Sequence, residues 1–594
     1  MNMVSSVRIK VIQFLEKWCS WVKTTTFRIR VLAWAHKLVE FAMWDIMTYL
    51  TEIWKLDITH SAAIINGFKG VEAIMPIGMA FFVDTFMGEY WMLLLSSLAY
   101  CCGVGILAIS TLQFLSKSVT NSCPEEKRPN CIGDLQKFLF FMALTLKALG
   151  VCGQTASLSS FLGRQSQNQT PTDKDDDQKR KRLGKFEFIL GRCVIVLLVI
   201  LATIVLSKLP WYVHFGIPAI GMVLATLLFM SSTSSYKHAA PKVGLLTTVR
   251  RVLVSSASKI FCRLPQHSNR VYDNHQPSSH FVPRTHSLRS FDKDVVIVQI
   301  QAPDEKAEHI SKRTELEDAK IFARMIPLWI TFIMCGVVSS IGDTYFLEQA
   351  NNMQNTFPPF ILLVFHDIAK FVFSKLFAVV AKKLFEKGLG KSIFPIGVIA
   401  AMLFSVVCCV IAAEVETRRL DLTEGLGLLE DRPDVKIPMG MFWLLPQYFF
   451  LAAIDGISDY LCDDLEIVSG YSIARFCIAP EYSSSVSFYL RLFTNAAFGL
   501  GPIGSVISVQ AAGKFSEIGR SSSWFRETLN ESHLDYYYLT LAALSSINLV
   551  LCILVSIWYI CQHLKATIGE LFTTDSIVKK LLRTIFSFHI FSLN

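Results

Sequence analysis

The sequence predicts an all-α integral membrane protein with twelve transmembrane helices arranged in two bundles of six. Hydrophobic residues make up 52% of the 594 residues, and the mean hydropathy is +0.43. Both values exceed what an ordinary soluble domain needs. Apolar runs long enough to cross a hydrocarbon core of about 30 Å, which takes about 20 helical residues, recur along the chain. A long polar stretch separates the first six runs from the last six.

The apolar runs place each expected helix in order. The first six helices are expected near residues 31–51, 62–83, 91–113, 137–162, 184–207 and 210–231. The last six are expected near residues 322–342, 357–383, 391–414, 437–462, 484–511 and 538–562. The chain then divides into an N-terminal segment, a first bundle, a linker, a second bundle and a tail, at residues 1–30, 31–231, 232–321, 322–562 and 563–594.

The linker and the tail differ in composition from the bundles. The linker contains "RLPQHSNRVYDNHQPSSHFVPRTHSLRS", which has no sustained apolar period and reads as a solvated loop. Its histidines are irregularly spaced, so we predict no metal site there. The tail mixes apolar and basic residues, and it either lies along the inner membrane surface or folds against the linker. Basic charge in both segments favours anionic lipids as partners and not nucleic acid.

Basic loops set the expected orientation. Lys and Arg near membrane spans favour the cytoplasmic side, and they gather in the N-terminal segment, in "KRKR" at 179–182 and in the linker. Both termini are therefore expected in the cytoplasm. The opposite side receives Cys123 and Cys131, which could form a disulfide, although their spacing leaves bridged and free states equally open. Asn530 in "NES" is a candidate glycosylation acceptor on the same side.

Several sequence landmarks occur in both halves of the chain. They include "MPIGMAFFVDTFMGEYWMLLLSSLAY", "ARMIPLWITFIMCGVVSS" and "FWLLPQYFFLAAIDG". In this order they resemble the plant nitrate and peptide transporter family, part of the proton-dependent oligopeptide transporters. The resemblance implies the major facilitator superfamily fold, in which two six-helix bundles rock about a site near the membrane midplane. It also implies proton-driven transport of a small solute such as nitrate, a short peptide, a hormone or another metabolite.

The first helix departs from the family pattern. Family members carry Glu-x-x-Glu-Arg before an "N-L-x-x-Y-L-T" ending, and this chain ends the helix with "DIMTYLT". Neither an ungapped alignment nor a deletion of one turn restores the charged motif. Glu40 is therefore interpreted as a chance acidic residue or a partial substitute. His36 could titrate near neutral pH, but its place near the cytoplasmic entry favours an interfacial role.

Two further family positions are changed. The fourth helix of the family has a buried lysine followed by proline, and this chain has Thr155 and Ala156 in those places within "GVCGQTASLSS". The loop between the second and third helices keeps Asp84 and Gly88 of the family's gating signature. It carries Glu89 where the family has a basic residue. We expect that change to weaken one charge contact of the gate.

Ionisable residues inside the predicted spans are functional candidates, because such groups are costly in a membrane and usually face a cavity or a partner. Lys69 and Glu72 are three residues apart, as are Asp367 and Lys370, and each pair is expected to neutralise itself. The candidates for proton coupling are Asp455, Asp343, Glu40 and His36. The candidates for lining a substrate cavity are Thr155, Lys69, Glu72, Thr344, Tyr345 and Arg491.

Asp455 and Asp343 fit a proton-coupling role best by position. A carboxylate that carries protons must be desolvated, yet it must also be reachable and close to a positive charge. Asp455 also lies near an acidic position that is common in the tenth helix of the family. Glu40 is interpreted as a residue without a part in proton coupling, because the expected partners on its helix are absent.

The remaining function classes are weighed by their motifs. The chain has no H-E-x-x-H, nucleophile elbow or P-loop, so an enzyme is not expected. We expect a secondary-active transporter of a small molecule or anion that works by alternating access, with protons as the coupling ion and no other cofactor. The alternatives are a transporter-like sensor or non-transporting partner protein, and a proton-independent facilitator or exporter. Plasma membrane and vacuolar membrane fit equally well, and the oligomeric state stays open.

Overall fold

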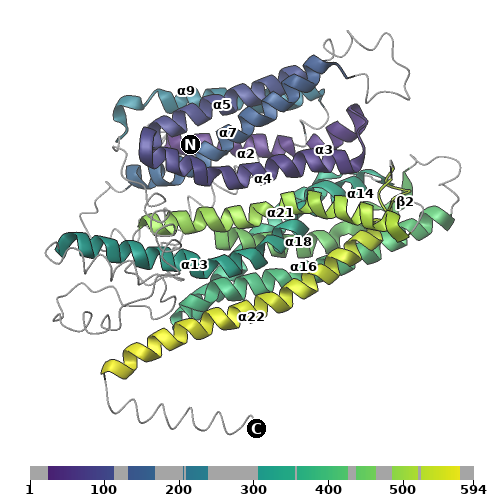
Figure 1. Cartoon of the computed structure of the whole chain (residues 1–594). Coiled ribbons are helices and arrows are strands. Elements are labelled where there is room, and N and C mark those ends of the chain that lie inside the picture. Colours follow the sequence, from purple (N-terminus) through teal and green to yellow (C-terminus); the bar gives the residue numbers. More distant parts are fainter. Residues whose placement is uncertain are drawn as a thin grey trace, which may run out of the picture.

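The computed structural model describes residues 25–112, 132–166, 205, 209–237, 306–354, 357–425, 436–462, 484–519, 523–526 and 528–574 (Figure 1). Almost all of the helix expected near 184–207 lies outside these residues, as do Cys123 and Cys131. Side chains are described from Phe27 onward in the first helix and as far as Ile560 in the last.

Helices dominate the first half of the described chain. In chain order they are α2 (Thr25–Met43), α3 (Ile46–Thr48), the π-helical turn η1 (Tyr49–Ile53), α4 (Ile58–Phe82), the π-helical turn η2 (Val83–Met87), α5 (Gly88–Ser110), α7 (Asp134–Ser166), α9 (Trp211–Met230) and the short η4 (Thr233–Ser235). Helices suit this sequence because a backbone inside a membrane must satisfy its own hydrogen bonds.

The second half adds helices and two short strands. In chain order they are α13 (Lys306–Ile341), the π-helical turn η5 (Gly342–Phe346), α14 (Leu347–Asn351), β1 (Met353–Gln354), α15 (Phe360–Glu386), η6 (Gly390–Ser392), α16 (Ile393–Gly425), β2 (Ile437–Gly440), η7 (Met441–Leu444), α18 (Leu445–Cys462), α21 (Ser484–Gly519) and α22 (Leu534–Thr574). The strands β1 and β2 pair in parallel.

Eight segments of the described chain are long and apolar enough to span a membrane, and one of them contains both α4 and α5. The helices α2 and α15 have 19 and 27 residues but fall outside this set. Each carries several charged residues, including Lys37 and Glu40 in α2 and Asp367 and Lys370 in α15. Charged residues in a helix therefore prevent its recognition as a membrane span by hydropathy alone.

Some predicted boundaries are wrong. The first helix is broken by a turn at Trp44 and Asp45, and it ends in the π-helical η1. The predicted tenth helix begins as β2 and η7, and α18 starts only at Leu445. Pro438 near its start lacks the amide hydrogen that a helix interior requires. The helix α13 already begins at Lys306, so the last part of the predicted linker is helical, and α22 continues to Thr574 in the predicted tail.

The helices form two groups that meet along α4 and α21 (Figure 1). The group from the first half contains α2, α4, α5, α7 and α9, and the group from the second half contains α13, α15, α16, α18, α21 and α22. We call them the N-terminal bundle and the C-terminal bundle. Where α4 and α21 cross, a Cβ added at Gly499 would overlap Ala73, and one added at Gly70 would overlap Ile503. Small residues therefore let the two bundles approach closely.

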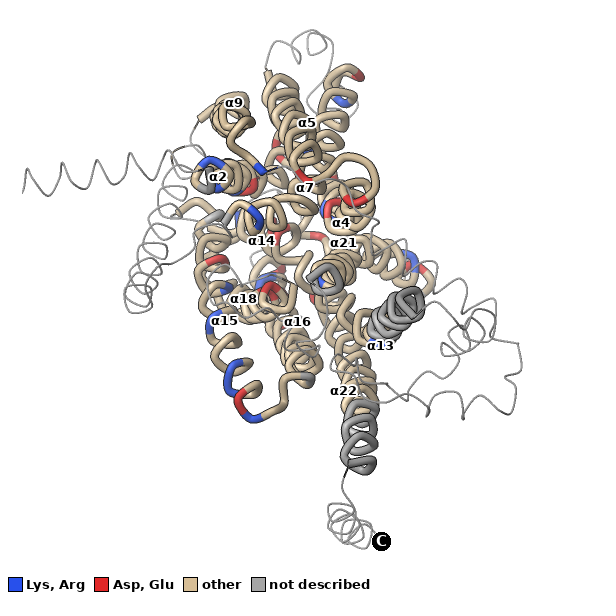
Figure 2. Tube along the Cα trace, turned by 90° about the vertical axis from the view of Figure 1, so that its left-hand side faces the viewer, with Lys and Arg blue, Asp and Glu red and all other residues tan. Residues whose placement is uncertain are grey.

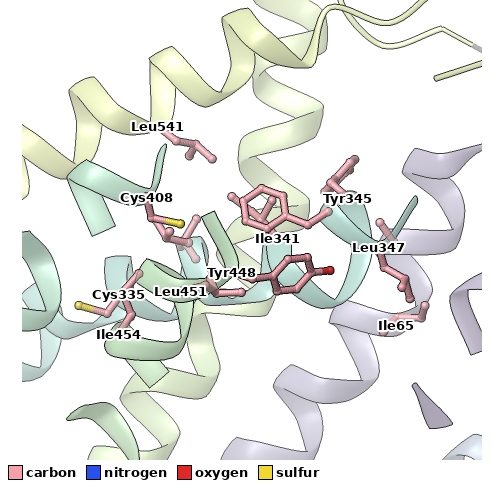
Figure 3. Close-up of a cluster of buried hydrophobic side chains, with 14 of the residues drawn as sticks. Ile65, Cys335, Ile341, Tyr345, Leu347, Cys408, Tyr448, Leu451, Ile454 and Leu541 are labelled. Atoms are coloured by element: carbon pink, nitrogen blue, oxygen red, sulfur yellow. The ribbon is translucent and has the colours of Figure 1, made fainter. Parts of the chain in front are cut away.

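The largest buried apolar cluster lies mainly in the C-terminal bundle and continues into the N-terminal bundle through α4 and its neighbouring helices. Figure 3 shows Tyr345, Tyr448 and Leu451 together in this cluster, with Ile65 reaching it from α4. Tyr345 is 1% exposed, and the centroid of its ring lies 6.1 Å from the centroid of the Tyr537 ring. This packing fixes η5, which carries Asp343, against the rest of the C-terminal bundle.

Candidate transport site

An ion pair joins the N-terminal bundle to the C-terminal bundle. Lys69 of α4 lies with its Nζ atom 2.5 Å from Oδ2 of Asp343 in η5. The two side chains keep 39% and 37% of their surface exposed. The local pair expected between Lys69 and Glu72 is therefore wrong, because the carboxylate of the opposite bundle binds the lysine.

Glu72 finds its partner within the N-terminal bundle. Lys147 of α7 donates to both carboxylate oxygens of Glu72, at 2.7 and 2.9 Å. Both side chains are almost buried, with 11% and 15% of their surface exposed. Cys152 of α7 also donates from its thiol to the backbone oxygen of Glu72. Because Lys147 neutralises Glu72 at this short range, α4 and α7 are held together by a charged contact.

A buried histidine and carboxylate meet inside the C-terminal bundle. Nε2 of His366 in α15 lies 3.0 Å from Oδ2 of Asp455 in α18, and the side chains are 8% and 10% exposed. Oδ1 of Asp455 is buried and has no hydrogen-bond partner among the described residues. One turn further along, Lys370 pairs with Asp459 at 3.0 Å. The expected pairing of Lys370 with Asp367 is therefore replaced by a contact between α15 and α18.

A second histidine and carboxylate lie on α2. Nε2 of His36 is 3.1 Å from one oxygen of Glu40, and Nζ of Lys37 is 2.6 Å from the other. Nδ1 of His36 lies 3.0 Å from the hydroxyl of the fully buried Tyr100 in α5. Glu40 thus has two partners on its own helix in place of those of the family motif. Its side chain is 40% exposed.

The charged groups of α2 face those of the opposite bundle. Lys37 is close enough to interact electrostatically with both Lys370 and Asp459. Figure 2 shows charged segments of α2, α4 and α18 in the central part of the molecule. The two bundles therefore present charges of both signs to each other.

Hydrogen bonds also connect the bundles at one end, where α3 meets α14. The side-chain amide of Asn351 donates to Oγ1 of Thr48 at 3.2 Å and to the carboxylate of Glu348 at 3.1 Å. The hydroxyl of Thr51 donates to the same carboxylate at 3.5 Å. We call this set of four residues the α3–α14 contact.

The other end is joined through α21. The hydroxyl of Tyr489 donates to Asp84 in η2 at 2.5 Å, and Arg491 donates to the hydroxyl of Ser159 in α7 at 3.0 Å. Arg491 also lies over the ring of Phe488. We call these two bonds the α21 contact. They place the predicted residues Asp84 and Arg491 at a junction between the bundles.

The loop between α4 and α5 has the geometry that its sequence suggests. Gly88 has a φ of 72°, a left-handed conformation that favours glycine. Glu89, which stands where the family has a basic residue, binds Arg164 of α7 at 2.8 Å. A basic partner for Glu89 is therefore supplied by α7 of the same bundle.

Four predicted site residues have other surroundings. Thr344 is fully buried and donates to the backbone oxygen of Ser340, and Tyr345 is buried in the apolar cluster, so neither lines an open surface. Asn530 is 3% exposed and accepts a hydrogen bond from Arg419, which argues against a glycan there. Thr155 is exposed, and its hydroxyl donates to the backbone of its own helix.

Sequence reasoning identified most of the charged residues but not their partners. Lys147, Ser159 and Tyr489 received no role, and His366 was not linked to Asp455. Lys147 and His366 carried a usable signal, since an ionisable group inside an apolar run requires a neutralising partner. The helix on which that partner lies is a tertiary property that spacing along one helix does not specify.

Comparison with known proteins places this architecture in a family. The protein-family model described as "POT family" matches residues 90–497 of the sequence. Protein NRT1/PTR FAMILY 5.5 of Arabidopsis thaliana is 34% identical over 542 residues, covering 89% of this chain and 96% of the relative. Protein NRT1/PTR FAMILY 8.3 of the same plant is 28% identical over 534 residues, covering 85% and 86%.

Solved structures share the fold. An auto-inhibited POT family peptide transporter matches with a TM-score of 0.56 and 15% identity, covering 89% of this chain and 96% of that structure. A POT family transporter in complex with 5-aminolevulinic acid matches with a TM-score of 0.53 and 12% identity, covering 90% and 96%. Such neighbours agree with the major facilitator fold expected from the sequence. The chain belongs to the POT family and is a multi-pass membrane transporter.

Proposed function

We propose that this protein is a proton-coupled secondary transporter that moves a small charged solute by alternating access. The observation that carries the proposal is the buried pair of His366 and Asp455. Family membership supports transport, and the paired charges between the bundles support a site at the level of Lys69 and Asp343. The solute would be nitrate, a short peptide, a hormone or another small metabolite.

The pair of His366 and Asp455 has the chemistry that proton coupling needs. One carboxylate oxygen of Asp455 binds the imidazole, and the other is buried without a described partner. A buried polar atom without a partner costs about 1–3 kcal/mol, so gaining or losing one proton there changes the local hydrogen bonds strongly. Imidazole is a side chain that proteins commonly use to carry and release protons. We assign proton binding to the two groups jointly, because closely coupled groups titrate as a pair.

Alternating access is supported by the way the bundles touch. The α3–α14 contact and the α21 contact each consist of a few hydrogen bonds, and the ion pair of Lys69 with Asp343 between the bundles is more than one-third exposed. Contacts of this kind contribute little individually and can exchange with water or solute. Rocking about the close crossing of α4 and α21 would open one end while the other stays closed.

The solute is proposed to bind by exchanging with the ion pair. A solute with a negative group could bind Lys69, and one with a positive group could bind Asp343. The solved relatives include one in complex with sulfate and one with alafosfalin, but those ligands belong to those proteins. We place the protein in the plasma membrane or the vacuolar membrane with both termini in the cytoplasm, as the basic segments favour.

Uptake by expressing cells tests the proposal. Nitrate, di- and tripeptides and plant hormones would be offered as a pooled panel at mildly acidic and at neutral external pH. Acid-stimulated accumulation above the external concentration supports proton coupling. Equilibration that does not depend on pH would contradict coupling and support a facilitator or exporter.

A transporter-like sensor is the second candidate, and the sequence gives a specific reason for it. The charged residues that the family carries in its first and fourth helices are absent, with Thr155 and Ala156 in place of lysine and proline. Saturable binding of a panel compound to purified protein, without flux in cells where the protein reaches the surface, would favour this function over transport.

A further inference from the structure

A fully buried ion pair lies away from the residues assigned to proton coupling and solute binding. Arg419 and Glu416 of α16 are 1% and 0% exposed, and the guanidinium donates to both carboxylate oxygens at 2.8 Å. The same guanidinium donates to Asn530 at 2.7 Å and to the backbone oxygen of Leu529 at 3.0 Å. The pair therefore ties α16 to the segment that precedes α22.

The pair also holds α14. The side-chain amide of Gln349 donates to Oε2 of Glu416 at 2.6 Å, and Gln349 accepts a bond from Gln447 of α18 at 3.2 Å. Gln349 and Gln447 are both fully buried. One side chain of α14 is thus fixed by α16 and by α18 at the same time.

The chain directly after α14 is fixed as well. The backbone amide of Ile437 in β2 donates to the oxygen of Asn352 at 3.0 Å, and β1 pairs with β2. The side-chain amide of Asn352 donates back to the backbone oxygen of Glu348 at 3.0 Å and to its carboxylate at 3.3 Å. The helix α14 is therefore held from both sides, although it has only five residues.

The neighbours of Gln349 along α14 are the residues that touch the N-terminal bundle. Glu348 immediately precedes it, and Asn351 follows two positions later. These two side chains bind Thr51 and Thr48 across the α3–α14 contact. Helix geometry places adjacent residues on different faces, so Gln349 can be buried while Glu348 and Asn351 reach outward.

We propose that Arg419, Glu416 and Gln349 are positioning residues that hold α14 so that Glu348 and Asn351 close the α3–α14 end of the transporter. The proposal rests on alternating access, the proposed mechanism, because it assigns closure of one end to these residues. A buried ion pair generally adds little stability compared with apolar side chains of equal volume. The hydrogen bonds of this charged pair are directional and fix α14 in one position. Apolar side chains in the same place would not specify that position as closely.

Crosslinking in membranes of expressing cells tests the proposal. Thr48→Cys combined with Asn351→Cys puts one thiol in each bundle at the α3–α14 contact, and a short bifunctional thiol reagent reports how often that end is closed. The two single-cysteine variants correct for reaction with native cysteines. Adding Gln349→Met, which keeps side-chain length but removes both amide bonds, is expected to lower the crosslinking rate about fivefold, as the loss of a net hydrogen bond would.

Two controls separate positioning from general damage. Ser159→Cys with Arg491→Cys reports the opposite end, where Gln349→Met should leave crosslinking unchanged or raise it. Gln154→Met removes a buried amide in α7, which bonds Ser97 and does not touch α14, so it should not alter crosslinking at Thr48 and Asn351. If Gln349→Met does not reach the membrane, Gln447→Met withdraws the other bond to Gln349 and should lower the rate by a smaller factor.

The outcomes separate this proposal from the proposed function. Unchanged crosslinking at the α3–α14 end in Gln349→Met, or in Gln447→Met, would overturn the positioning role even if transport is proton-coupled. An equal decrease at both ends would also overturn it, because it would show loosening of the whole fold. A decrease at this end alone would support it even if no panel compound is transported.

Discussion

The two bundles each contain a histidine paired with a carboxylate, but the two pairs have different surroundings. In the C-terminal bundle, His366 and Asp455 come from different helices and are about nine-tenths buried. In the N-terminal bundle, His36 and Glu40 are one turn apart on α2, and Glu40 is 40% exposed and also bound to Lys37. The same chemical pair is therefore desolvated in one bundle and partly hydrated in the other.

This difference determines what a proton can do at each pair. Near water, a change of charge is screened and a lost partner is replaced by solvent. In the buried pair, a change of charge must be met by movement of the surrounding groups, because no solvent replaces the lost contact. The C-terminal pair is thus suited to couple protonation to helix movement, and the N-terminal pair is suited to a static contact.

The largest expected effect is on accumulation in Asp455→Asn. The amide keeps the shape of the carboxylate but binds no proton, so acid-stimulated accumulation should fall at least about tenfold if the proton step is lost. Uptake at acidic and neutral external pH measures this. The control is Asp459→Asn, which removes a half-exposed carboxylate from the same helix and should retain most acid stimulation. An equal loss of acid-stimulated accumulation in Asp455→Asn and Asp459→Asn would show that burial does not distinguish the proton site.

Stability should distinguish the two pairs next. His366→Ala removes the only hydrogen-bond partner described for the buried Asp455, and we expect a cost of about 1–3 kcal/mol. Glu40→Ala removes the more exposed member of the other pair and leaves the bond between His36 and Tyr100 in place, so its cost should stay below about 1 kcal/mol. Thermal unfolding of the purified proteins in detergent gives the difference. A larger loss for Glu40→Ala would reverse the assignment of buried and exposed pairs.

The ion pair between the bundles should show an intermediate effect. Asp343→Asn removes the charge facing Lys69. Because both side chains are more than one-third exposed, we expect the maximal uptake rate to fall by only about threefold. The double variant Lys69→Asp with Asp343→Lys restores opposite charges in exchanged positions. Partial recovery by the exchange supports a direct pairing. Additive losses would mean that the two residues act separately.

The smallest effect is expected for Glu40→Gln. The substitution removes a hydrated charge whose partners are on its own helix, so uptake should change by less than about twofold at either pH. Side-by-side uptake with wild type measures it. A loss of acid stimulation as large as that of Asp455→Asn would make Glu40 the proton site.

Hydropathy predicted much of the helical fold but not its irregular ends. The span expected at 210–231 agrees closely with α9 (Trp211–Met230), because an apolar run marks its own limits in a membrane. The polar start of α13 lacks that signal, and so its beginning at Lys306 was missed. The residues of β2 belong to an apolar run that predicts a helix, but they pair with the distant strand β1.

The candidate site was predictable in its residues and not in its contacts. Asp343 and Asp455 stand out in the sequence because a carboxylate in an apolar run is costly. Their partners Lys69 and His366 lie 274 and 89 residues away along the chain. Spacing rules describe neighbours on one helix, so they assigned Lys69 to Glu72 and Lys370 to Asp367. The packing of different helices determines the observed pairs.

Counterflow in Asp455→Asn tests the central claim most directly. Cells or vesicles preloaded with an unlabelled panel substrate would take up the labelled form without a proton gradient, and the same preparation would then be tested for accumulation with an acid-outside gradient. We predict that Asp455→Asn keeps counterflow and loses accumulation, while Glu40→Gln keeps both. Accumulation by Asp455→Asn at the level of wild type would show that the buried pair of His366 and Asp455 does not couple protons to transport.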